Sequence, residues 1–376
     1  MNVDFDLRGQ VGVRLLDAEA GDRLAGARQL GPLERRLERD PDVTIRFVDR
    51  VDHGRLTYVA WPDAAFDERR FYLLTGKGRL EAKSIVPFES LGVGCEIVCE
   101  RGLAAVPLLL PIVGLTALAK GVLPLHASAF VHDGRGVLVT GWAKGGKSET
   151  LLAFMTRGAR YVGDEWVYLA GDGQMFGVPE PIRLWGWQVE QLRSLAPRLS
   201  RSERWRLRGL GALAGTAGRL APRRAGGRLG SLARRGAGLV RRQVSVQVPP
   251  SRLFGPDRLV DVAPVDAVVL ASSHESDEVR LDPADGREIG QRMLASLAHE
   301  RRTLLDAYRQ FRFAFPDRRN ELIERAPEIE AELIDRALGG RPAAWLRHPY
   351  PCRLEALFPP LNALLADLGA ASSPPR

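Results

Sequence analysis

The sequence has 376 residues, of which 45% are hydrophobic and 27% are charged, and its formal net charge is +8. This length is sufficient for two domains of ordinary size, and the composition excludes an intrinsically disordered chain. The three cysteines, Cys95, Cys99 and Cys352, are too few for a disulfide framework and indicate a reducing, cytoplasmic compartment.

The first part of the chain is predicted to be rich in β-strands. Three short apolar runs, Val43–Val48, Leu56–Trp61 and Phe71–Gly76, are separated by polar or glycine-bearing segments. We therefore expect a strand-rich N-terminal region over residues 1–101.

Two of the cysteines lie close together in the segment GVGCEIVCE. On a strand, the even spacing of Cys95 and Cys99 places both thiols on one face. Neither a histidine nor a second cysteine pair lies nearby to complete a zinc site, so we interpret both as packed core residues.

The chain has no segment that we interpret as a targeting or membrane-spanning element. The segment MNVDFDLRGQ contains neither a basic region nor an apolar one, so we expect no signal peptide. The apolar segment Gly102–Leu118 is short for a bilayer span and contains Pro107 and Pro111. We expect it to form a buried helix or helical hairpin.

The next segments predict a β-hairpin, a helix and a further strand. The apolar runs LHASAFV and GVLVTG are joined by HDGR, and Asp133 followed by Gly134 is a strong hairpin signal. Leu151, Phe154 and Met155 then recur at helical spacing, and the following Gly158 is a plausible helix stop. The run RYVGDEWVYL predicts a strand that an acidic pair interrupts.

Between the hairpin and the helix lies the octet GWAKGGKS, residues 141–148. It fits the phosphate-loop pattern G-x-x-x-x-G-K-[ST], and it has the expected strand before it and helix after it. Glycines let successive N–H groups point at phosphate oxygens, and the start of the helix favours negative charge. Lys147 can reach the β- and γ-phosphates, and the Ser148 hydroxyl can bind Mg²⁺.

Two alternatives remain open at this loop. Lys144 could add a phosphate contact or could point outward into solvent. A glycine-rich turn that contains Gly-Lys-Ser by chance is disfavoured by the matching flanks. The expected nucleotide-binding residues are those of the loop and the first helical turn: Gly141, Trp142, Ala143, Lys144, Gly145, Gly146, Lys147, Ser148 and Glu149.

The surrounding segment, about residues 123–185, resembles the catalytic core of the bacterial HPr serine kinase/phosphorylase family. Members carry a histidine before the hairpin, a phosphate loop ending in GKSE, a helix ending in Arg-Gly and a short strand with two adjacent acids. The corresponding residues occur here in the same order and with the same separations: His126, Gly145–Glu149, Arg157, Gly158, Asp164 and Glu165.

The resemblance implies an α/β (α+β) fold with a β-rich phosphate-loop kinase core related to that of phosphoenolpyruvate carboxykinase. It implies transfer of the γ-phosphoryl group of ATP, with Mg²⁺, to a hydroxyl that is usually a serine. Relatives that modify ribosomal peptides such as lasso precursors offer a second context. Family members often form rings, so a homo-oligomer is one expectation.

The resemblance also implies the catalytic residues, which are Asp164, Glu165, His126 and Lys147. The acidic pair is normally Asp-Asp in the family, where one acid serves the metal site and the other acts as the base toward the serine hydroxyl. Here the second acid is Glu165, one methylene longer, so we expect Asp164 to be essential and leave the base unassigned. The alternative is a pair of solvated acids in a turn.

Three further residues carry less specific signals. Glu180 and Arg183, in VPEPIRL, resemble a downstream Glu-x-x-Arg element that holds metal and phosphate in the family, so the expected metal ligands are Ser148, Asp164 and Glu180. His126 follows the apolar run LPL and could instead be a satisfied core residue. His274 has no evident partner, and we expect it in a loop.

The net positive charge of residues 201–242 exceeds the net charge of +8 of the whole chain, and Glu203 is their single acid. We interpret them as a basic insertion in the nucleotide-binding domain. They could dock an acidic protein or leader peptide, or be a solvated arginine-rich insert. Nucleic acid is disfavoured because aromatic residues other than Trp205 are scarce and no reader module is present.

The remaining chain predicts one buried strand and then helices. Val265–Ser273 is apolar and resembles a buried strand, and Ile289, Met293, Leu297 and Leu304 follow at helical spacing. A later helix in NELIERAPEIEAELIDRAL is predicted to break at Pro327. We therefore expect a nucleotide-binding domain over residues 102–280, a helical part over residues 281–368 and a disordered tail over residues 369–376.

Two functional hypotheses follow. The first is an ATP- and Mg²⁺-dependent kinase acting on a hydroxyl of a protein, peptide or small molecule. The second is a nucleotide-binding regulatory or scaffold protein with little transfer activity, in which the Asp-to-Glu change reflects lost catalysis. HPr itself is a doubtful acceptor because no resemblance to the family's N-terminal domain or phosphorylase signature is evident. A GTP switch is disfavoured because no Asn-Lys-x-Asp element occurs.

Overall fold

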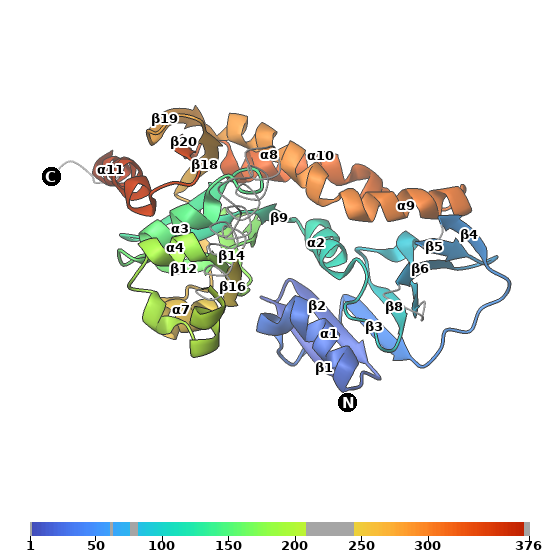
Figure 1. The fold of residues 1–376 in the computed structure, drawn as a ribbon. Helices are drawn as coiled ribbons and strands as arrows, with labels where there is room; N and C mark the ends of the chain where they lie inside the picture. The colour runs from blue at the N-terminus through green and yellow to red at the C-terminus, as the bar shows by residue number, and fades with distance from the viewer. Residues whose placement is uncertain (1, 61–62, 76–81, 208–243, 372–376) are drawn as a thin grey trace, which may run out of the picture. The chain divides into compact units, whose positions relative to one another are not determined.

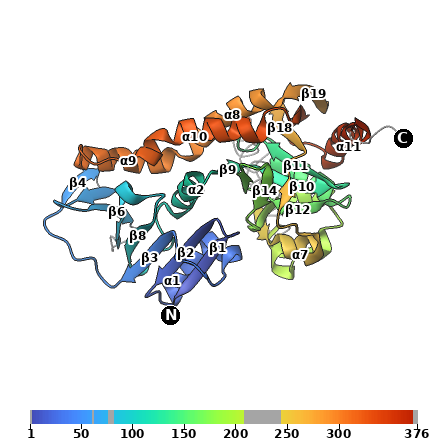
Figure 2. The ribbon, with the colours of Figure 1, turned by 180° about the vertical axis from the view of Figure 1, so that it is seen from behind.

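The computed structural model describes residues 2–60, 63–75, 82–207 and 244–371. The chain is a mixed α/β protein (Figures 1 and 2) that divides into two compact units. Unit 1 comprises Met1–Leu125, Tyr168–Gly173 and Gly286–Gly340. Unit 2 comprises His126–Val167, Gln174–Asp285 and Arg341–Arg376. The region expected to be one helical C-terminal part is therefore shared between the two units.

Unit 1 contains a sheet of eight strands in the order β1-β2-β3-β8-β7-β6-β5-β4. All three predicted apolar runs form strands, and the β2–β3 and β3–β8 pairs are parallel. The strands are β1 (Val3–Leu7), β2 (Val11–Leu16), β3 (Val43–Val48), β4 (Thr57–Ala60), β5 (Ala64–Phe66), β6 (Phe71–Thr75), β7 (Ala82–Ile85) and β8 (Cys95–Glu100).

The two cysteines of β8 are free and buried, as predicted. Burial raises the pKa of the Cys95 thiol to about 12 and that of the Cys99 thiol to about 11, because a thiolate would lose its hydration there. Both residues therefore act as small apolar groups of the unit 1 core.

The helix Leu109–Ala119 of unit 1 is buried over most of its length. In the segment Gly102–Leu118, which we predicted to be a buried helix or helical hairpin, the helix begins at Leu109, after a turn. No helix among the described residues is long and apolar enough to cross a membrane. The helices are α1 (Ala20–Leu30), α2 (Leu109–Ala119), α8 (Gly286–Glu300), α9 (Arg302–Ala314) and α10 (Glu321–Leu338), with short 3₁₀ turns at Gly31–Leu33 and Phe88–Ser90.

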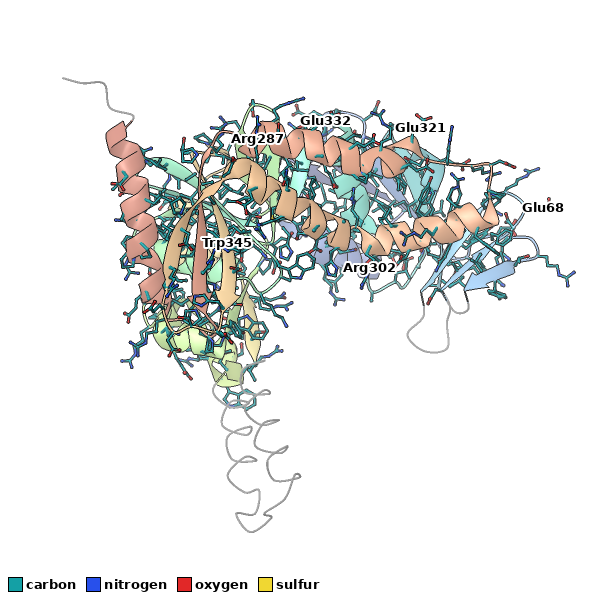
Figure 3. The ribbon with its side chains drawn as sticks, turned by 90° about the horizontal axis from the view of Figure 1, so that it is seen from above. Glu68, Arg287, Arg302, Glu321, Glu332 and Trp345 are labelled. Carbon is teal, nitrogen blue, oxygen red and sulfur yellow. The ribbon has the colours of Figure 1, made fainter. Side chains whose placement is uncertain are left out.

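Helix α10 contradicts the predicted break at Pro327, because it continues through this residue to Leu338. Asn320 caps the helix by accepting the Ile323 N–H at 3.0 Å, and its amide donates to Phe88 O at 2.7 Å. The buried stripe that includes Leu333 fixes the helix beyond the proline. Figure 3 shows α10, marked by Glu321 and Glu332, running alongside α8.

Unit 2 is built on a sheet of six strands in the order β12-β10-β11-β18-β20-β19. The predicted hairpin is confirmed: β10 and β11 are antiparallel, and Asp133 and Gly134 both have the positive φ of a type I′ turn. The strands are β10 (Ser128–His132), β11 (Arg135–Thr140), β12 (Arg160–Gly163), β18 (Ala267–His274), β19 (Arg280–Asp285) and β20 (Pro342–Pro349).

Strand β20 lies in a region that we expected to be helical. It alternates buried and half-buried residues, and it pairs in parallel with β18, which in turn pairs in parallel with β11. Trp345 of β20, labelled in Figure 3, donates its indole N–H to Ser272 Oγ of β18 at 2.7 Å. Because β11, β18 and β20 are parallel neighbours in that order, their carboxyl ends lie at the same edge of the sheet.

Helices α3 (Lys147–Met155) and α11 (Leu354–Ala371) pack against this sheet and share its core. Phe130 of β10 stacks on Phe154 of α3 with ring centroids 4.6 Å apart. Helix α11 extends to Ala371, which lies within the expected tail. The remaining elements are β9 (Val122–His126), β13 (Trp166–Ala170), β14 (Gln174–Gly177), β15 (Ile182–Trp185), α4 (Gly186–Gln191), β16 (Ser245–Val248), α7 (Pro250–Phe254) and β17 (Ala263–Pro264), with 3₁₀ turns at Ala196–Arg198 and Pro256–Arg258.

Candidate active site

The octet forms a tight turn, here called the glycine loop (residues 141–146), between β11 and α3. Gly141 has a φ of +146°, and a Cβ on it would lie 2.3 Å from Ala271 O of β18. Gly146 precedes the helix with a φ of +106°. Both positions require glycine, because residues with a side chain rarely adopt such positive φ values and because an added Cβ would clash with neighbouring atoms. The loop thus curls back on the carboxyl end of the parallel strands.

His348, which was not predicted from the sequence, contacts the glycine loop from the end of β20. Its imidazole comes from the end of β20 and is fully buried. Nε2 lies 2.9 Å from Gly145 O, and Nδ1 lies 2.8 Å from Pro349 O. A Cβ on Gly146 would lie only 1.9 Å from this Nε2. The alternation of buried positions in PAAWLRHP was the one sequence signal that could have placed this histidine in a strand.

Lys147, the first residue of α3, is buried and turned toward the loop. Its ammonium donates to Gly141 O at 3.2 Å and to Trp142 O at 3.0 Å. Its own carbonyl accepts the hydroxyl of Ser128 at 2.9 Å, which ties the start of α3 to β10. The lysine therefore holds a positive charge within the curve of the loop.

Ser148 and Asp164, predicted as metal ligands, lie in direct contact. The Ser148 hydroxyl is 3.0 Å from Asp164 Oδ1 and 2.9 Å from Oδ2. Asp164 follows β12 and is only 3% exposed. Burial, followed by the charge of Glu165, raises the pKa of Asp164 to about 7, although the Ser148 hydrogen bond and Lys147 oppose the shift. A carboxylate in such a position is stabilised by a nearby cation.

Glu165 is joined to His126, another predicted catalytic residue. Glu165 Oε2 lies 2.9 Å from His126 Nε2, and this hydrogen bond is the main cause that lowers the pKa of Glu165, against the effect of burial. Glu165 has a φ of +68°, in the left-handed region, and its carbonyl accepts the Ala127 N–H at 3.1 Å. The His126 ring also stacks against Trp166, with ring centroids 6.0 Å apart.

Glu180 belongs to the same electrostatic group. Burial and then the charge of Glu165 raise the pKa of Glu180 to about 7, while His126 lowers it. Arg183 of β15 is exposed, and its charge lowers the pKa of Glu165. The structure therefore brings Glu180 into the electrostatic range of the acidic pair that precedes it in the chain.

The other residues of the expected nucleotide site differ in their surroundings. Glu149 accepts a hydrogen bond from Gln188 of α4 at 3.0 Å, and Gln188 is only 1% exposed. Trp142 is 51% exposed, and Ala143 and Lys144 are exposed as well, with Lys144 at a φ of +64°. The outer side of the loop thus faces solvent, whereas its inner side lies on the sheet.

The donor set fits Mg²⁺ bound together with a triphosphate. Among the described residues, no group of three or more His, Cys, Asp and Glu side chains is placed to hold a metal ion by itself. Ser148 and Asp164 nevertheless supply adjacent hydroxyl and carboxylate oxygens, and Mg²⁺ typically takes one or two protein ligands together with phosphates and water. The raised pKa of Asp164 is consistent with a site that a cation completes.

Two further sequence signals remain, His274 and the basic insertion. His274, which we expected in a loop, is instead the last residue of β18, because this strand continues through it in parallel with β20, and its Nδ1 accepts the Ser276 N–H at 3.1 Å. Of the basic insertion, residues 201–207 are helical and Glu203 pairs with Arg252, whereas residues 208–243 lie outside the described residues. The acidic-partner expectation for residues 201–242 therefore stays a prediction.

No family model matches the sequence, and no curated protein is significantly similar to it. Among solved structures, the HPr(Ser) kinase/phosphatase from Coxiella burnetii is similar, with 19% identity over 42% of this chain and 70% of that chain. The TM-score of 0.19 is too low to establish a shared fold.

Proposed function

We propose that the protein is an ATP- and Mg²⁺-dependent kinase that transfers the γ-phosphoryl group to a serine or another hydroxyl of a protein, a peptide or a small molecule. The observation that carries the proposal is the contact between Ser148 and Asp164 at 2.9 Å, at the start of the helix that the glycine loop precedes. The local sequence pattern of residues 123–185 supports the same class of reaction.

The glycine loop and Lys147 would bind the triphosphate. Successive N–H groups of a curled main chain and the start of α3 favour negative charge at this point. The ammonium of Lys147 now donates to two loop carbonyls, and phosphate oxygens are stronger acceptors for it. Binding would therefore exchange these two hydrogen bonds for charge-assisted ones.

Ser148 and Asp164 would hold Mg²⁺. When bound, this ion neutralises charge on the phosphates during transfer. Asp164 must be ionised to act as a ligand, and a positive charge beside it lowers its pKa from the value of about 7 that burial produces. Glu180 adds a second carboxylate to this region, and its ionisation would likewise be favoured by a cation.

Glu165 and His126 would orient the acceptor hydroxyl. The lowered pKa keeps Glu165 ionised, and the hydrogen bond at 2.9 Å fixes its carboxylate. In transfer, the hydroxyl oxygen forms a bond to the γ-phosphorus as the bond from this phosphorus to the β,γ-bridging oxygen breaks. ADP leaves with the electron pair of that bond, and the hydroxyl proton passes to the Glu165 carboxylate.

A second candidate is a nucleotide-binding regulatory protein without transfer activity. One observation favours it: Glu165 Oε2 is already engaged by His126, and the carboxylate therefore has less capacity to accept a hydroxyl proton. In this case the glycine loop would bind ATP, and no acceptor would be phosphorylated.

The two candidates are separated by incubation with γ-labelled ATP, Mg²⁺ and a library of peptides that each contain one serine, threonine or tyrosine, together with free serine. The kinase predicts a labelled acceptor with the native chain and none with Lys147→Ala or Asp164→Asn. Arg198→Ala, at an exposed position outside the proposed site residues, should retain activity. Tight ATP binding with no label in any acceptor would favour the regulatory candidate, and full transfer by either site variant would refute the proposed roles.

A further inference from the structure

A hollow in unit 2 lies at the carboxyl end of α3, whereas the glycine loop precedes the first residue of this helix. Its volume is about 740 Å³, and residues 156–157, 191–194 and 353–355 line it. Since α3 has nine residues at about 1.5 Å each, the helix separates the two sites by about 13 Å. We call this hollow the arginine pocket.

Each of the three lining segments contributes one arginine: Arg157, Arg193 and Arg353. The one acid in the lining is Glu355, so the pocket has an excess of positive charge. Arg157 is held in place, because it donates to Ala153 O at 3.3 Å and lies 4.5 Å from the centre of the Phe358 ring. All three arginines are exposed and accessible to a partner.

Gln191 fixes the walls of the arginine pocket. Its amide donates to Cys352 O at 3.0 Å, and its carbonyl accepts the Leu354 N–H at 2.9 Å. This reciprocal pair ties the end of α4, two residues before Arg193, to the residues that flank Arg353. A pocket braced in this way loses less conformational entropy when a partner binds.

Helix α4 also connects the arginine pocket to the candidate active site. Gln188, one turn before Gln191, donates to Glu149 next to Ser148 at 3.0 Å. The side chains of one short helix therefore contact both the start of α3 and the wall of the arginine pocket. A partner bound in the pocket would lie on the element that contacts the active site.

We propose that the arginine pocket docks an acidic segment of a protein or peptide partner. Three guanidinium groups from three segments, open to solvent, match carboxylates carried at several positions of one chain. A compact anion would require convergent, buried donors, and the three arginines are exposed. The proposal goes beyond the proposed function, and it holds whether or not the protein transfers a phosphoryl group.

The test measures fluorescence anisotropy of a labelled hexaglutamate peptide with the full chain, in the absence of nucleotide. The double variant Arg193→Glu/Arg353→Glu should bind at least about tenfold more weakly than the native chain. The matched control, Arg160→Glu/Arg198→Glu, makes the same change of net charge at exposed positions outside the pocket and should lose less than about threefold. Equal losses in both variants would show that binding follows overall charge, and would overturn the proposal.

A second variant tests the proposal even if the charge-reversal variant Arg193→Glu/Arg353→Glu does not fold. Glu355→Gln removes the one acid of the pocket and should tighten hexaglutamate binding about twofold to threefold, and unchanged or weaker binding contradicts the docking role. Citrate serves as the compact competitor. We compare the concentrations of citrate and of unlabelled hexaglutamate that displace the labelled peptide. If citrate displaces it at the lower concentration, the pocket binds small anions and peptide docking is refuted.

Discussion

The imidazole of His348 occupies the space that a side chain on Gly146 would need. Its Nε2 lies 2.9 Å from Gly145 O and 1.9 Å from the ideal position of a Cβ on Gly146. A buried histidine from the end of one strand therefore leaves room only for glycine at the start of the helix. This fit holds the glycine loop against the sheet, and it makes the loop sensitive to changes about 200 residues away in sequence.

Substitution of Gly146 by alanine should abolish nucleotide binding. The added Cβ would meet His348, and the φ of +106° is unfavourable for alanine by about 1–2 kcal/mol. The affinity for a fluorescent ATP analogue measures the effect. Gly158→Ala is the matched control, since Gly158 has a similar φ of +100° but nothing within 4 Å of an added Cβ. It should lower stability and leave nucleotide affinity within about twofold.

Removal of the His348 side chain should partly restore nucleotide binding to the Gly146→Ala variant. Gly146→Ala/His348→Ala relieves the contact with the added Cβ, whereas His348→Ala alone loses the hydrogen bond to Gly145 O and leaves a cavity, at a cost of about 1–3 kcal/mol. The double variant should therefore bind the nucleotide analogue more tightly than Gly146→Ala. Strictly additive losses would show that the two residues do not interact.

Asp164→Asn should stabilise the fold at alkaline pH while it removes phosphoryl transfer. The folded-state pKa of Asp164 is about 7, raised above its ordinary value of 3.8, so the folded chain binds the proton more readily than the unfolded one. Its contribution to stability is complete below pH 3.8 and is lost as pH rises toward 7, by up to about 4 kcal/mol. Asparagine carries no charge to desolvate. The variant's unfolding free energy relative to the native chain should therefore increase between about pH 5 and pH 8.

Mg²⁺ should oppose the loss of stability that the native chain undergoes as pH rises, because a cation beside Asp164 stabilises the carboxylate. The melting temperature at about pH 8 should rise with Mg²⁺ and ATP in the native chain and much less in Asp164→Asn. An identical rise in both proteins would place the metal elsewhere. If Mg²⁺ and ATP raised the melting temperature of the native chain equally at about pH 5 and at about pH 8, the raised pKa of the Asp164 carboxyl group would be contradicted.

His126→Gln should shift the acid limb of the rate profile for phosphoryl transfer. The His126 hydrogen bond is the main cause that lowers the pKa of Glu165, so the variant should raise this pKa. The base would then become protonated at a higher pH, and kcat/KM should begin to fall at a higher pH than in the native chain. Trp166→Phe keeps an aromatic ring beside His126 and should leave the limb in place. An unshifted limb in His126→Gln would remove Glu165 as the base.

Pro327→Ala should stabilise α10. Pro327 is exposed within the helix and cannot donate to the carbonyl of Ile323, one turn earlier, so alanine should raise the unfolding free energy by up to about 3 kcal/mol. Urea denaturation measures this change. Glu332→Ala, at another exposed position of the same helix, should change stability by less than about 0.5 kcal/mol. A destabilised proline variant would mean that the ring makes packing contacts that outweigh the missing hydrogen bond.

Local patterns in the sequence were sufficient to predict the elements around the glycine loop. The spacing of glycines in GWAKGGKS, the Asp133-Gly134 turn and the apolar period after Lys147 each depend on conformational preferences of a few neighbouring residues. The acidic pair was recognisable as an interruption of an apolar strand, and its expected catalytic role came from the resemblance of residues 123–185 to a kinase family.

Longer-range packing decided the rest. Helix α10 continues through Pro327 because its buried stripe outweighs the local cost of the proline. Strand β20 forms because β18 offers a parallel edge, although its residues follow a helical region.

The sequence by itself therefore determined which residues curve the loop and which acids follow the next strand. Only the tertiary structure decided that His348 supports the loop, that Gln188 binds Glu149, and that three arginines meet at the end of α3. The physical reason is that these contacts join segments far apart in the chain. Their geometry depends on how sheet and helices pack, and no local pattern of residues records it.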